Sequence, residues 1–260
     1  TDEPALAAGD QIDRYRVISL LGSGGMGEVY LAHDERLDRK IALKLLPADL
    51  TTNEERLRRF QQEARAISAL NHPNIITIHE IGQVDGRHFI ATEFVDGETL
   101  RQRMQSGPLS LVESVNIAIQ ICGALAAAHQ AEIVHRDIKP ENIMMRRDGY
   151  VKVLDFSLAK LTQQEHMPFV SGTAETVDVS SGLLMGTLKY MSPEQAQGLQ
   201  VDQRSDIFSL GVVLYEMLTA HAPFEGKTSA ELISAVLNKR PLSLEHYNAG
   251  TADELQQLIE

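Results

Sequence analysis

A short, strongly polar segment between two apolar runs is the feature that most limits how this chain can fold. Residues 134–142, with the sequence VHRDIKPEN, contain two carboxylates, an arginine, a lysine and a carboxamide. Burying charged groups is costly unless they are paired or used. The density of functional groups therefore favours a loop that carries chemistry over a solvated turn that happens to be charged.

The order of the side chains in this loop indicates the kind of chemistry. Asp137 is followed by Lys139 two residues later and by Asn142 five residues later. Such a set supplies a base or nucleophile-positioning group, a partner for phosphate and a ligand for a hard metal ion. Phosphoryl transfer needs these parts, because its transition state is stabilised by positioning and charge rather than by covalent chemistry.

The length and composition are those of an ordinary globular protein. With 260 residues, of which 43% are hydrophobic and 23% charged, the chain can bury a large core in one large domain or two lobes. The net charge of −12 argues against a nucleic-acid binder, which requires a basic face.

The single cysteine, Cys122, excludes an internal disulfide and suits a reducing compartment. Its place in an apolar helical run predicts a small core residue rather than a reactive thiol.

The longest uncharged run, residues 114–131, is long enough to raise the question of a membrane span. Asn116, Gln120, Gly123 and Gln130 are spaced to form a polar or small stripe on one side of a helix. We therefore predict a core helix with one different face rather than a lipid-facing span.

A glycine-rich segment near the N-terminus follows a stretch with high β propensity. Residues 14–21 run directly into Gly22, Gly24 and Gly27. Glycines let backbone N–H groups approach phosphate oxygens closely, since no Cβ intervenes. Residues 29–32 continue as a strand, whereas a dinucleotide-binding turn would open a helix. A plain β-hairpin is the alternative for this segment taken alone.

Alternation and helical periodicity predict the remaining elements. Further strands are expected over residues 40–46, 75–81, 88–94 and 150–154, with Asp85 and Gly86 as the turn between the second and third of these. Helices are expected from a capping sequence at residues 51–55 to Leu70, and over residues 109–130, 202–218 and 229–238, with another beginning near Asp253.

In residues 134–142 the chain resembles the protein kinase family, whose catalytic loop reads H-R-D-x-x-x-x-N. With Lys139, the loop resembles that of the serine/threonine branch of the family rather than that of the tyrosine branch. KIALKLL at residues 40–46 is similar to the family's V-A-I-K strand, and DFS at residues 155–157 matches D-F-G except for its serine. GTLKYMSPE at residues 186–194 resembles the segment that seats the substrate peptide, and the following QA extends a likeness to bacterial receptor-type kinases.

The resemblance covers roughly residues 12–260 and implies an α+β, two-lobed kinase-like fold. A small β-rich lobe over residues 1–94 would contain the Gly-rich loop and a regulatory helix. A larger helical lobe over residues 95–260 would contain the catalytic and activation loops. Kinase domains continue for two more helices, so the resemblance also implies a large lobe that is incomplete at its end, and a Glu194 without its usual arginine partner.

For the small lobe, the resemblance implies an ATP site. Lys44 would bind the α- and β-phosphates and pair with Glu63, which falls near the centre of the apolar face of its helix. Taken alone, Lys44 also fits an edge lysine and Glu63 a boundary glutamate. Thr92 would be the gatekeeper and residues 93–95 the hinge that binds adenine. The full set of implied ATP-binding residues is Leu21, Gly22, Gly24, Gly27, Val29, Ala42, Lys44, Thr92, Glu93, Val95, Asn142 and Asp155.

For the large lobe, the resemblance assigns the catalytic roles. Asp137 would accept or orient the proton of the substrate hydroxyl, and Lys139 would bind the γ-phosphate as a point charge. Asn142 and Asp155 would hold Mg²⁺, which prefers a few hard oxygen ligands together with phosphates and waters. Phe156 would be the packing switch. Ser157 lacks the conformational freedom of the usual glycine, although no ligand of ATP or metal is lost.

Residues 161–185 form a long polar segment at the place where the activation loop belongs. A phosphate there would pair with Arg136 and order the loop. We predict autophosphorylation, with Ser180 and Ser181 preferred by their distance from the next motif. The candidate sites are Thr173, Thr176, Ser180, Ser181 and Thr187. The resemblance further implies that Thr187 bridges Asp137 and Lys139, and that Asp206 anchors the backbone of the catalytic loop.

These features predict a protein serine/threonine kinase that transfers the γ-phosphate of ATP, with Mg²⁺, to Ser or Thr hydroxyls of protein substrates. The alternative is a pseudokinase or a weakly active ATP-binding scaffold, because of Ser157 and the incomplete end. A small-molecule phosphotransferase is disfavoured, since such enzymes lack a segment like residues 186–194.

We expect no nucleic-acid partner and no membrane contact from this chain segment, and a homodimer is one further expectation. The expected location is the cytoplasm. One arrangement that fits this location is a domain that forms the cytoplasmic part of a longer, membrane-anchored chain.

Overall fold

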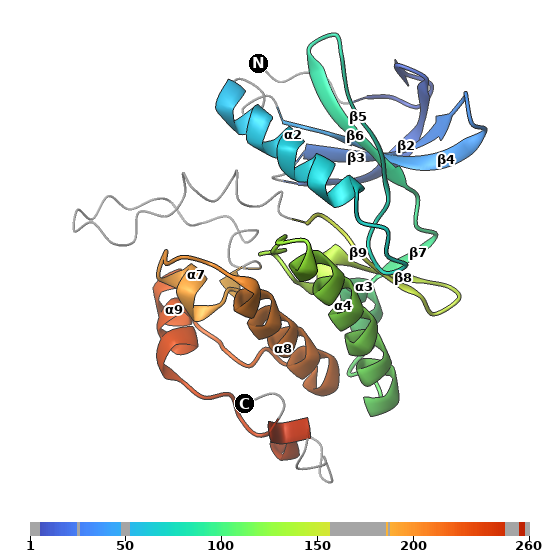
Figure 1. The fold of residues 1–260 in the computed structure, drawn as a ribbon. Helices are drawn as coiled ribbons and strands as arrows, with labels where there is room; N and C mark the ends of the chain where they lie inside the picture. The colour runs from blue at the N-terminus through green and yellow to red at the C-terminus, as the bar shows by residue number, and fades with distance from the viewer. Residues whose placement is uncertain are drawn as a thin grey trace. The chain divides into compact units, whose positions relative to one another are not determined.

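The computed structural model describes residues 6–24, 27–47, 53–156, 186, 188–247 and 255–257. The chain divides into two compact units, Thr1–Asp96 and Gly97–Glu260. The N-terminal unit is built on a β-sheet and the C-terminal unit mainly on helices (Figure 1). This combination is the α+β class that the sequence predicts.

The N-terminal unit is a six-stranded antiparallel sheet with the strand order β1-β2-β3-β4-β6-β5. The turn between β5 and β6 consists of Asp85 and Gly86, whose φ angles are 51° and 81°. Positive φ at both positions gives a turn that matches the twist of the flanking strands, which explains why an Asp-Gly pair marks it. β5 begins at Ile78 rather than at residue 75 as predicted. The strands are β1 (Gln11–Ile12), β2 (Tyr15–Gly24), β3 (Gly27–Asp34), β4 (Arg39–Leu45), β5 (Ile78–Val84) and β6 (Arg87–Glu93).

Alternation along these strands places a hydrophobic core on one face of the sheet. The buried members of this core are Ile12, Tyr15, Val17, Tyr30, Ala32, Ile41, Leu43, Phe89 and Ala91. Helix α2 (Glu54–Ser68) packs against β5 and buries Phe60, Ala64 and Ile67 of its predicted apolar face. The side chain of Asn53 caps this helix by accepting a hydrogen bond from the N–H of Glu55 at 3.1 Å. The two predicted threonines of the cap lie outside the described residues.

The C-terminal unit combines a small antiparallel sheet, in the order β7-β8-β9, with a set of helices. The two longest helices, α4 and α8, pack against each other, and α4 also packs against β9. The strands are β7 (Gly97–Thr99), β8 (Ile143–Arg146) and β9 (Val151–Val153). The helices are α3 (Leu100–Met104), α4 (Leu111–Gln130), η1 (Pro140–Asn142), α7 (Pro193–Ala196), α8 (Gln203–Thr219), α9 (Ser229–Asn238) and η2 (Leu244–His246).

The predicted helices of this unit are confirmed with small shifts at their ends. Ser110 caps α4 and Asp202 caps α8, each through a side-chain oxygen that accepts a backbone N–H of the first turn. α8 is buried along most of its length, as its nearly uniform apolar sequence predicts. Among the described residues, α4 is the one helix long and apolar enough to cross a membrane. Residues 255–257 are helical, whereas the predicted start near Asp253 lies outside the described residues.

The prediction that Cys122 is a small core residue is wrong. Cys122 is exposed on α4, on the same side as Val112 and Ile119, which are 71% and 62% exposed. Because apolar residues also occupy the exposed side of this helix, beside the predicted polar stripe, the sequence did not show that Cys122 is turned outward. Partial burial among its neighbours raises the pKa of the thiol. The cysteine is thus accessible but is not activated as a thiolate.

Two glycines of the C-terminal unit are expected to respond to alanine in opposite ways. A Cβ at Gly97 would lie 1.9 Å from the carbonyl oxygen of Met145 on the neighbouring strand. We expect Gly97→Ala to lower the free energy of unfolding by about 1–3 kcal/mol, the usual cost of overpacking. A Cβ at Gly211, inside α8, would meet no atom within 4 Å. Gly211→Ala is expected to raise stability by about 1 kcal/mol, because alanine favours a helix over glycine.

Urea unfolding of both variants beside the parent protein measures this difference. A parent-like midpoint for Gly97→Ala would show that β7 does not approach β8 as closely as described.

Candidate active site

Two predicted catalytic side chains and one predicted metal ligand meet in the loop between α4 and β8. Asp137 is only 5% exposed, and the Nζ of Lys139 lies 2.8 Å from its Oδ2. The side-chain nitrogen of Asn142 donates to the backbone oxygen of Asp137 at 2.8 Å and to its Oδ2 at 2.9 Å. The short turn of η1, which begins at Pro140, brings Asn142 back to Asp137. The loop therefore presents a carboxylate, a cation and a carboxamide at one place.

Asn142 and Asp155, the two predicted magnesium ligands, lie on segments that are joined by a backbone hydrogen bond. Both donor bonds of the Asn142 amide go to Asp137, so its side-chain carbonyl oxygen is the atom that can face a cation. The backbone oxygen of Asn142 accepts the N–H of Leu154 at 2.8 Å, and Leu154 directly precedes Asp155. Within the described part of the chain, no cluster of three or more His, Cys, Asp or Glu side chains could hold a metal ion. Two hard oxygen ligands completed by phosphates and waters suit Mg²⁺.

The backbone of the catalytic loop is held by the carboxylate of Asp206, as predicted. Its Oδ2 accepts the N–H of His135 at 2.8 Å, and its Oδ1 accepts the N–H of Arg136 at 2.7 Å. The Nε2 of His129 lies 2.7 Å from Oδ2. Asp206 is fully buried in the first turn of α8, where the helix dipole favours a negative charge. Arg136 has a φ of 69°, a strained conformation for a residue other than glycine.

The segment after β9 places Asp155 and Phe156 in a defined arrangement. Asp155 has a φ of 52°, which is again unusual and typical of functional sites. Phe156 is buried, and its ring centroid lies 4.5 Å from that of His135. A ring nitrogen of His135 also lies 2.8 Å from the carbonyl oxygen of Leu154. The loop and this segment are thus joined by both a ring contact and a polar contact. Ser157 lies outside the described residues.

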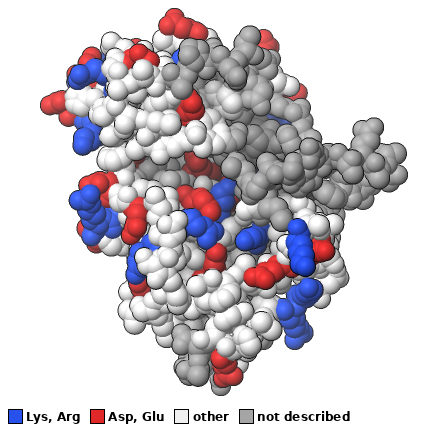
Figure 2. Space-filling view, turned by 180° about the vertical axis from the view of Figure 1, so that it is seen from behind, with Lys and Arg blue, Asp and Glu red and all other residues white. Residues whose placement is uncertain are grey.

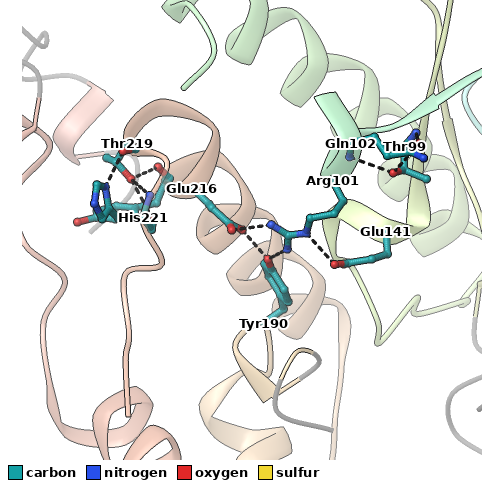
Figure 3. Close-up of polar contacts among 9 residues, drawn as sticks. Thr99, Arg101, Gln102, Glu141, Tyr190, Glu216, Thr219 and His221 are labelled. Carbon is teal, nitrogen blue, oxygen red and sulfur yellow. Dashed lines mark hydrogen bonds and ion pairs between the residues drawn. The ribbon is translucent and has the colours of Figure 1, made fainter. Parts of the chain in front are cut away.

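A cluster around Arg101 joins the end of the catalytic loop to more distant parts of the unit (Figure 3). The guanidinium of Arg101, on α3, binds Glu141 at 2.8 Å, Glu216 of α8 at 2.7 Å and the hydroxyl of Tyr190. Tyr190 also donates to Glu216. Burial and the nearby carboxylate of Glu216 raise the pKa of the Tyr190 phenol. Burial alone would lower the pKa of Arg101, but its hydrogen bonds with the two glutamates outweigh this and raise it.

Five of the predicted ATP-binding residues of the N-terminal unit share one face of its sheet, namely Gly22, Val29, Ala42, Lys44 and Thr92. In the strand register Gly22 lies opposite Val29, Val29 opposite Lys44, and Ala42 opposite Thr92. Directly opposite residues point to the same face, as do residues two apart along a strand. This face is the one opposite the hydrophobic core, whose members occupy the alternate positions.

The glycines of the β2–β3 hairpin fit a phosphate-binding loop. Gly27 has a φ of 101°, and a Cβ there would lie 2.0 Å from the carbonyl oxygen of Leu45, so only glycine fits at this position. A Cβ at Gly22 or Gly24 would meet no atom within 4 Å. Leu21, beside them, is 48% exposed. The backbone of these residues is therefore open to a ligand.

The other residues predicted for this unit lie on β4, α2 and the end of β6. Lys44 is buried in β4 and Glu63 is half-buried on α2; their pairing stays a prediction. The N–H of Glu93 donates to the carbonyl of Thr77 at 2.9 Å, so this N–H is already used within the unit, and the hinge role stays a prediction. Val95, two residues further along the chain, is buried.

The carboxylate of Glu194 accepts a hydrogen bond within the described part of the chain. The hydroxyl of Ser205, which is fully buried near the start of α8, donates a hydrogen bond to its carboxylate. Burial alone would raise the pKa of Glu194, but the hydrogen bonds that its carboxylate accepts from Ser205, from its own backbone and from Ser192 together lower it. The candidate phosphorylation sites Thr173, Thr176, Ser180, Ser181 and Thr187 lie outside the described residues.

Comparison with known proteins identifies the family. Residues 15–259 match the family model described as the protein kinase domain. The chain belongs to the protein kinase family. The match covers both units, so the kinase domain has the two-lobed fold that the sequence predicts.

Relatives of this kinase domain include serine/threonine-protein kinase PrkC of Bacillus subtilis, which is 38% identical over 95% of the chain, and serine/threonine-protein kinase pkn3 of Myxococcus xanthus, which is 44% identical over 88%. The chain spans 36% and 42% of the lengths of these two proteins. Among solved structures, the kinase domain of Mycobacterium tuberculosis PknI aligns with a TM-score of 0.72 and 27% identity, over 99% of this chain and 91% of that one.

Several residues that shape the site were not found by sequence reasoning. Arg101, Glu141 and Glu216 are separated by long stretches of chain, and no local pattern connects them. The side chain of Gln195 donates to the carbonyl of Arg136 at 2.8 Å. The sequence indicated only a likeness to bacterial kinases at this position and no role for the side chain. Its spacing from Ser192 is that of a capping box, which was the available signal that its side chain is ordered.

Substituting Asp206 is expected to cost far more stability than substituting a second aspartate at the same helix end. Asp206→Asn places an amide N–H₂ against a backbone N–H, so at least one buried donor is left without a partner. We expect a loss of about 2–4 kcal/mol in the free energy of unfolding. Asp202→Asn serves as the control, because Asp202 is an exposed cap residue and asparagine caps equally well. Denaturant titration measures the free energy of unfolding of both variants. Equal losses in the two variants would refute the anchoring role of Asp206.

Proposed function

We propose that this kinase domain transfers the γ-phosphate of ATP, with Mg²⁺, to Ser or Thr hydroxyls of protein substrates. The observation that supports this most directly is the arrangement of Asp137, Lys139 and Asn142 on a loop whose backbone is anchored by the buried Asp206. Phosphoryl transfer depends on positioning and on charge stabilisation. A loop that is fixed at its backbone and carries these three groups meets both needs.

Four residues of the C-terminal unit have separate roles in the proposed reaction. Asp137 receives or orients the proton of the attacking hydroxyl, and Lys139, held 2.8 Å from it, offsets the charge of the γ-phosphate. Asn142 and Asp155 hold Mg²⁺, which neutralises negative charge on the phosphates when it is bound. The bond between Leu154 and Asn142 keeps the two ligands in register.

The N-terminal unit is proposed to supply the nucleotide site. The hairpin with Gly22, Gly24 and Gly27 would lie over the phosphates, and Lys44 would bind the α- and β-phosphates while paired with Glu63. Thr92 would be the gatekeeper, with the hinge at residues 93–95. The shared face of Gly22, Val29, Ala42, Lys44 and Thr92 in the strand register supports this part of the proposal.

The relatives give no support to the alternative of a pseudokinase or scaffold. They are named as serine/threonine protein kinases at 38% and 44% identity. The metal-ligand candidates Asn142 and Asp155 are both present despite the serine that follows Phe156. We therefore retain the enzyme as the single proposed function.

The proposed partners are ATP and protein substrates with Ser or Thr. Nucleic acid is not among them: acidic and basic side chains lie close together on the face shown in Figure 2, and the chain has a net charge of −12. We further propose that the domain acts in the cytoplasm without membrane contacts of its own; a longer membrane-anchored chain is one arrangement that would place it there. A homodimer is an additional proposal that a sedimentation measurement can decide.

Asp137→Asn is expected to reduce phosphate transfer by about 10²–10⁴-fold, the usual contribution of a positioned proton acceptor. ATP binding should be nearly unchanged, because the amide keeps the size of the carboxylate. Transfer of the radiolabelled γ-phosphate to a generic protein substrate measures the first effect, and calorimetric titration with a nonhydrolysable ATP analogue measures the second. A reaction with the metal chelated by EDTA is the blank.

The matched control is Asp148→Asn, which alters an aspartate on the exposed turn between β8 and β9 that pairs with Arg146. This variant should transfer phosphate at the parent rate. Equal incorporation of label by the Asp137 variant and the parent protein would rule out the proposed reaction.

We also propose that the domain phosphorylates itself between residues 171 and 187, preferentially at Ser180 and Ser181. Arg136 supports this, because its Nε is buried and has no hydrogen-bond partner within the described part of the chain. A phosphate is a suitable partner for such a guanidinium.

Phosphopeptide mass spectrometry after incubation with ATP and Mg²⁺ tests this expectation. We expect phosphate in the 171–187 region of the parent protein and none in the Asp137→Asn variant. An active parent protein without phosphate in that region would contradict the proposal.

A further inference from the structure

We propose that Gln195 is a positioning residue for the transfer reaction, which holds the backbone carbonyl of Arg136 and so sets the direction of Asp137. This inference rests on the function proposed above. The hydrogen bonds of the Gln195 side chain go to the backbone of Arg136 and Ser192 and not to the metal-ligand candidates. It acts on the reaction through the backbone that precedes the proton acceptor.

The side chain of Gln195 is ordered by bonds to both of its polar atoms. The residue is 7% exposed on the short helix α7. Its Nε2 donates to the carbonyl of Arg136 at 2.8 Å, and its Oε1 accepts the N–H of Ser192 at 3.0 Å. A backbone carbonyl can only accept and a backbone N–H can only donate, so the orientation of the amide is unambiguous. The N–H of Gln195 completes the capping box by donating to the Ser192 hydroxyl at 3.3 Å.

Arg136 is the residue of the catalytic loop that most needs external support. Its φ of 69° is strained for a side-chain-bearing residue, at a cost of about 1–3 kcal/mol that its surroundings must offset. Its N–H is held by Asp206 of α8 at 2.7 Å, and its carbonyl is held by Gln195 of α7 at 2.8 Å. Two side chains from different helices therefore fix the backbone N–H and the backbone carbonyl of this single residue.

Fixing the carbonyl of Arg136 also fixes the start of Asp137. The peptide bond between them is planar, so the Arg136 carbonyl and the Asp137 N–H turn together. That N–H donates to the Nδ1 of His135 at 3.2 Å. If the bond to Gln195 is lost, this peptide plane can rotate, and the carboxylate of Asp137 moves with it. A small displacement of a catalytic group lowers the rate much more than it lowers binding.

The position of Gln195 also connects Asp137 to the segment that is proposed to seat the substrate peptide. That segment, residues 186–194, ends inside α7, and Ser192 is the cap of this helix. The same side chain therefore binds the end of the seating segment through Ser192 and the catalytic loop through Arg136.

The decisive variant is Gln195→Glu, because it removes only one of the two side-chain bonds. Glutamate has the length of glutamine and keeps the oxygen that accepts the Ser192 N–H, and serine with glutamate three residues later is itself a capping box. Towards Arg136, however, it presents a carboxylate oxygen where an N–H donor is needed. Gln195→Met removes both bonds without adding charge. Gln197→Glu is the control, since it adds the same charge at an exposed position next to the same helix.

We expect kcat to fall about 10- to 100-fold in Gln195→Glu and in Gln195→Met, with the KM for ATP close to that of the parent protein. Gln197→Glu should keep the parent kcat. Hydrogen exchange gives a readout independent of turnover: the amides of residues 135–137 should exchange faster in both Gln195 variants than in the parent and the control.

A parent-like kcat in either folded Gln195 variant would overturn the inference, even if its thermal stability were lower. An equal loss of kcat in Gln197→Glu would also overturn it. If Gln195→Glu does not fold, Gln195→Met decides the question. If the parent protein transfers no phosphate, the proposed function fails, and the exchange of residues 135–137 still decides whether Gln195 fixes this backbone.

Discussion

The buried carboxylate of Asp206 is the interaction on which the catalytic loop depends. It lies at the start of α8 with no exposed surface and accepts hydrogen bonds from two consecutive backbone N–H groups, those of His135 and Arg136. A buried charge is tolerated only when it is satisfied in this way. The two N–H groups are equally dependent on it, because each would otherwise be buried without an acceptor at a cost of about 1–3 kcal/mol. Loop and helix therefore stabilise each other.

From this anchor, further bonds fix the loop from several directions. α7 reaches the carbonyl of Arg136 through Gln195, and the strand that leads to Asp155 reaches Asn142 and His135 through Leu154. Arg101 holds Glu141, next to Asn142, and joins it to α8. These contacts come from segments separated by tens of residues in the sequence. The precision of the site is thus a property of the whole C-terminal unit and not of the loop alone.

Sequence reasoning succeeded where a local pattern reports a local structure. The Asp85–Gly86 turn, the apolar face of α2 and the extents of α4, α8 and α9 follow from neighbouring residues. It failed where the outcome depends on which face of an element is turned inward. Cys122 was placed in the core because α4 is apolar on nearly every side, yet it is exposed. The Arg101 cluster was not foreseen. Arg101 and Glu216 are 115 residues apart in the sequence, and no spacing rule connects the members of the cluster.

The division of labour among these residues bears on how a kinase-like sequence should be interpreted. Asp137, Lys139 and Asn142, which form the recognisable motif, supply the functional groups, whereas Asp206 and Gln195, which hold the strained backbone at Arg136, lie outside it. A chain could therefore keep every motif residue and still lose the geometry through a change in either supporting residue. A site of this kind is better judged by the partners of its backbone groups than by its motif alone, since those partners determine where the proton acceptor points.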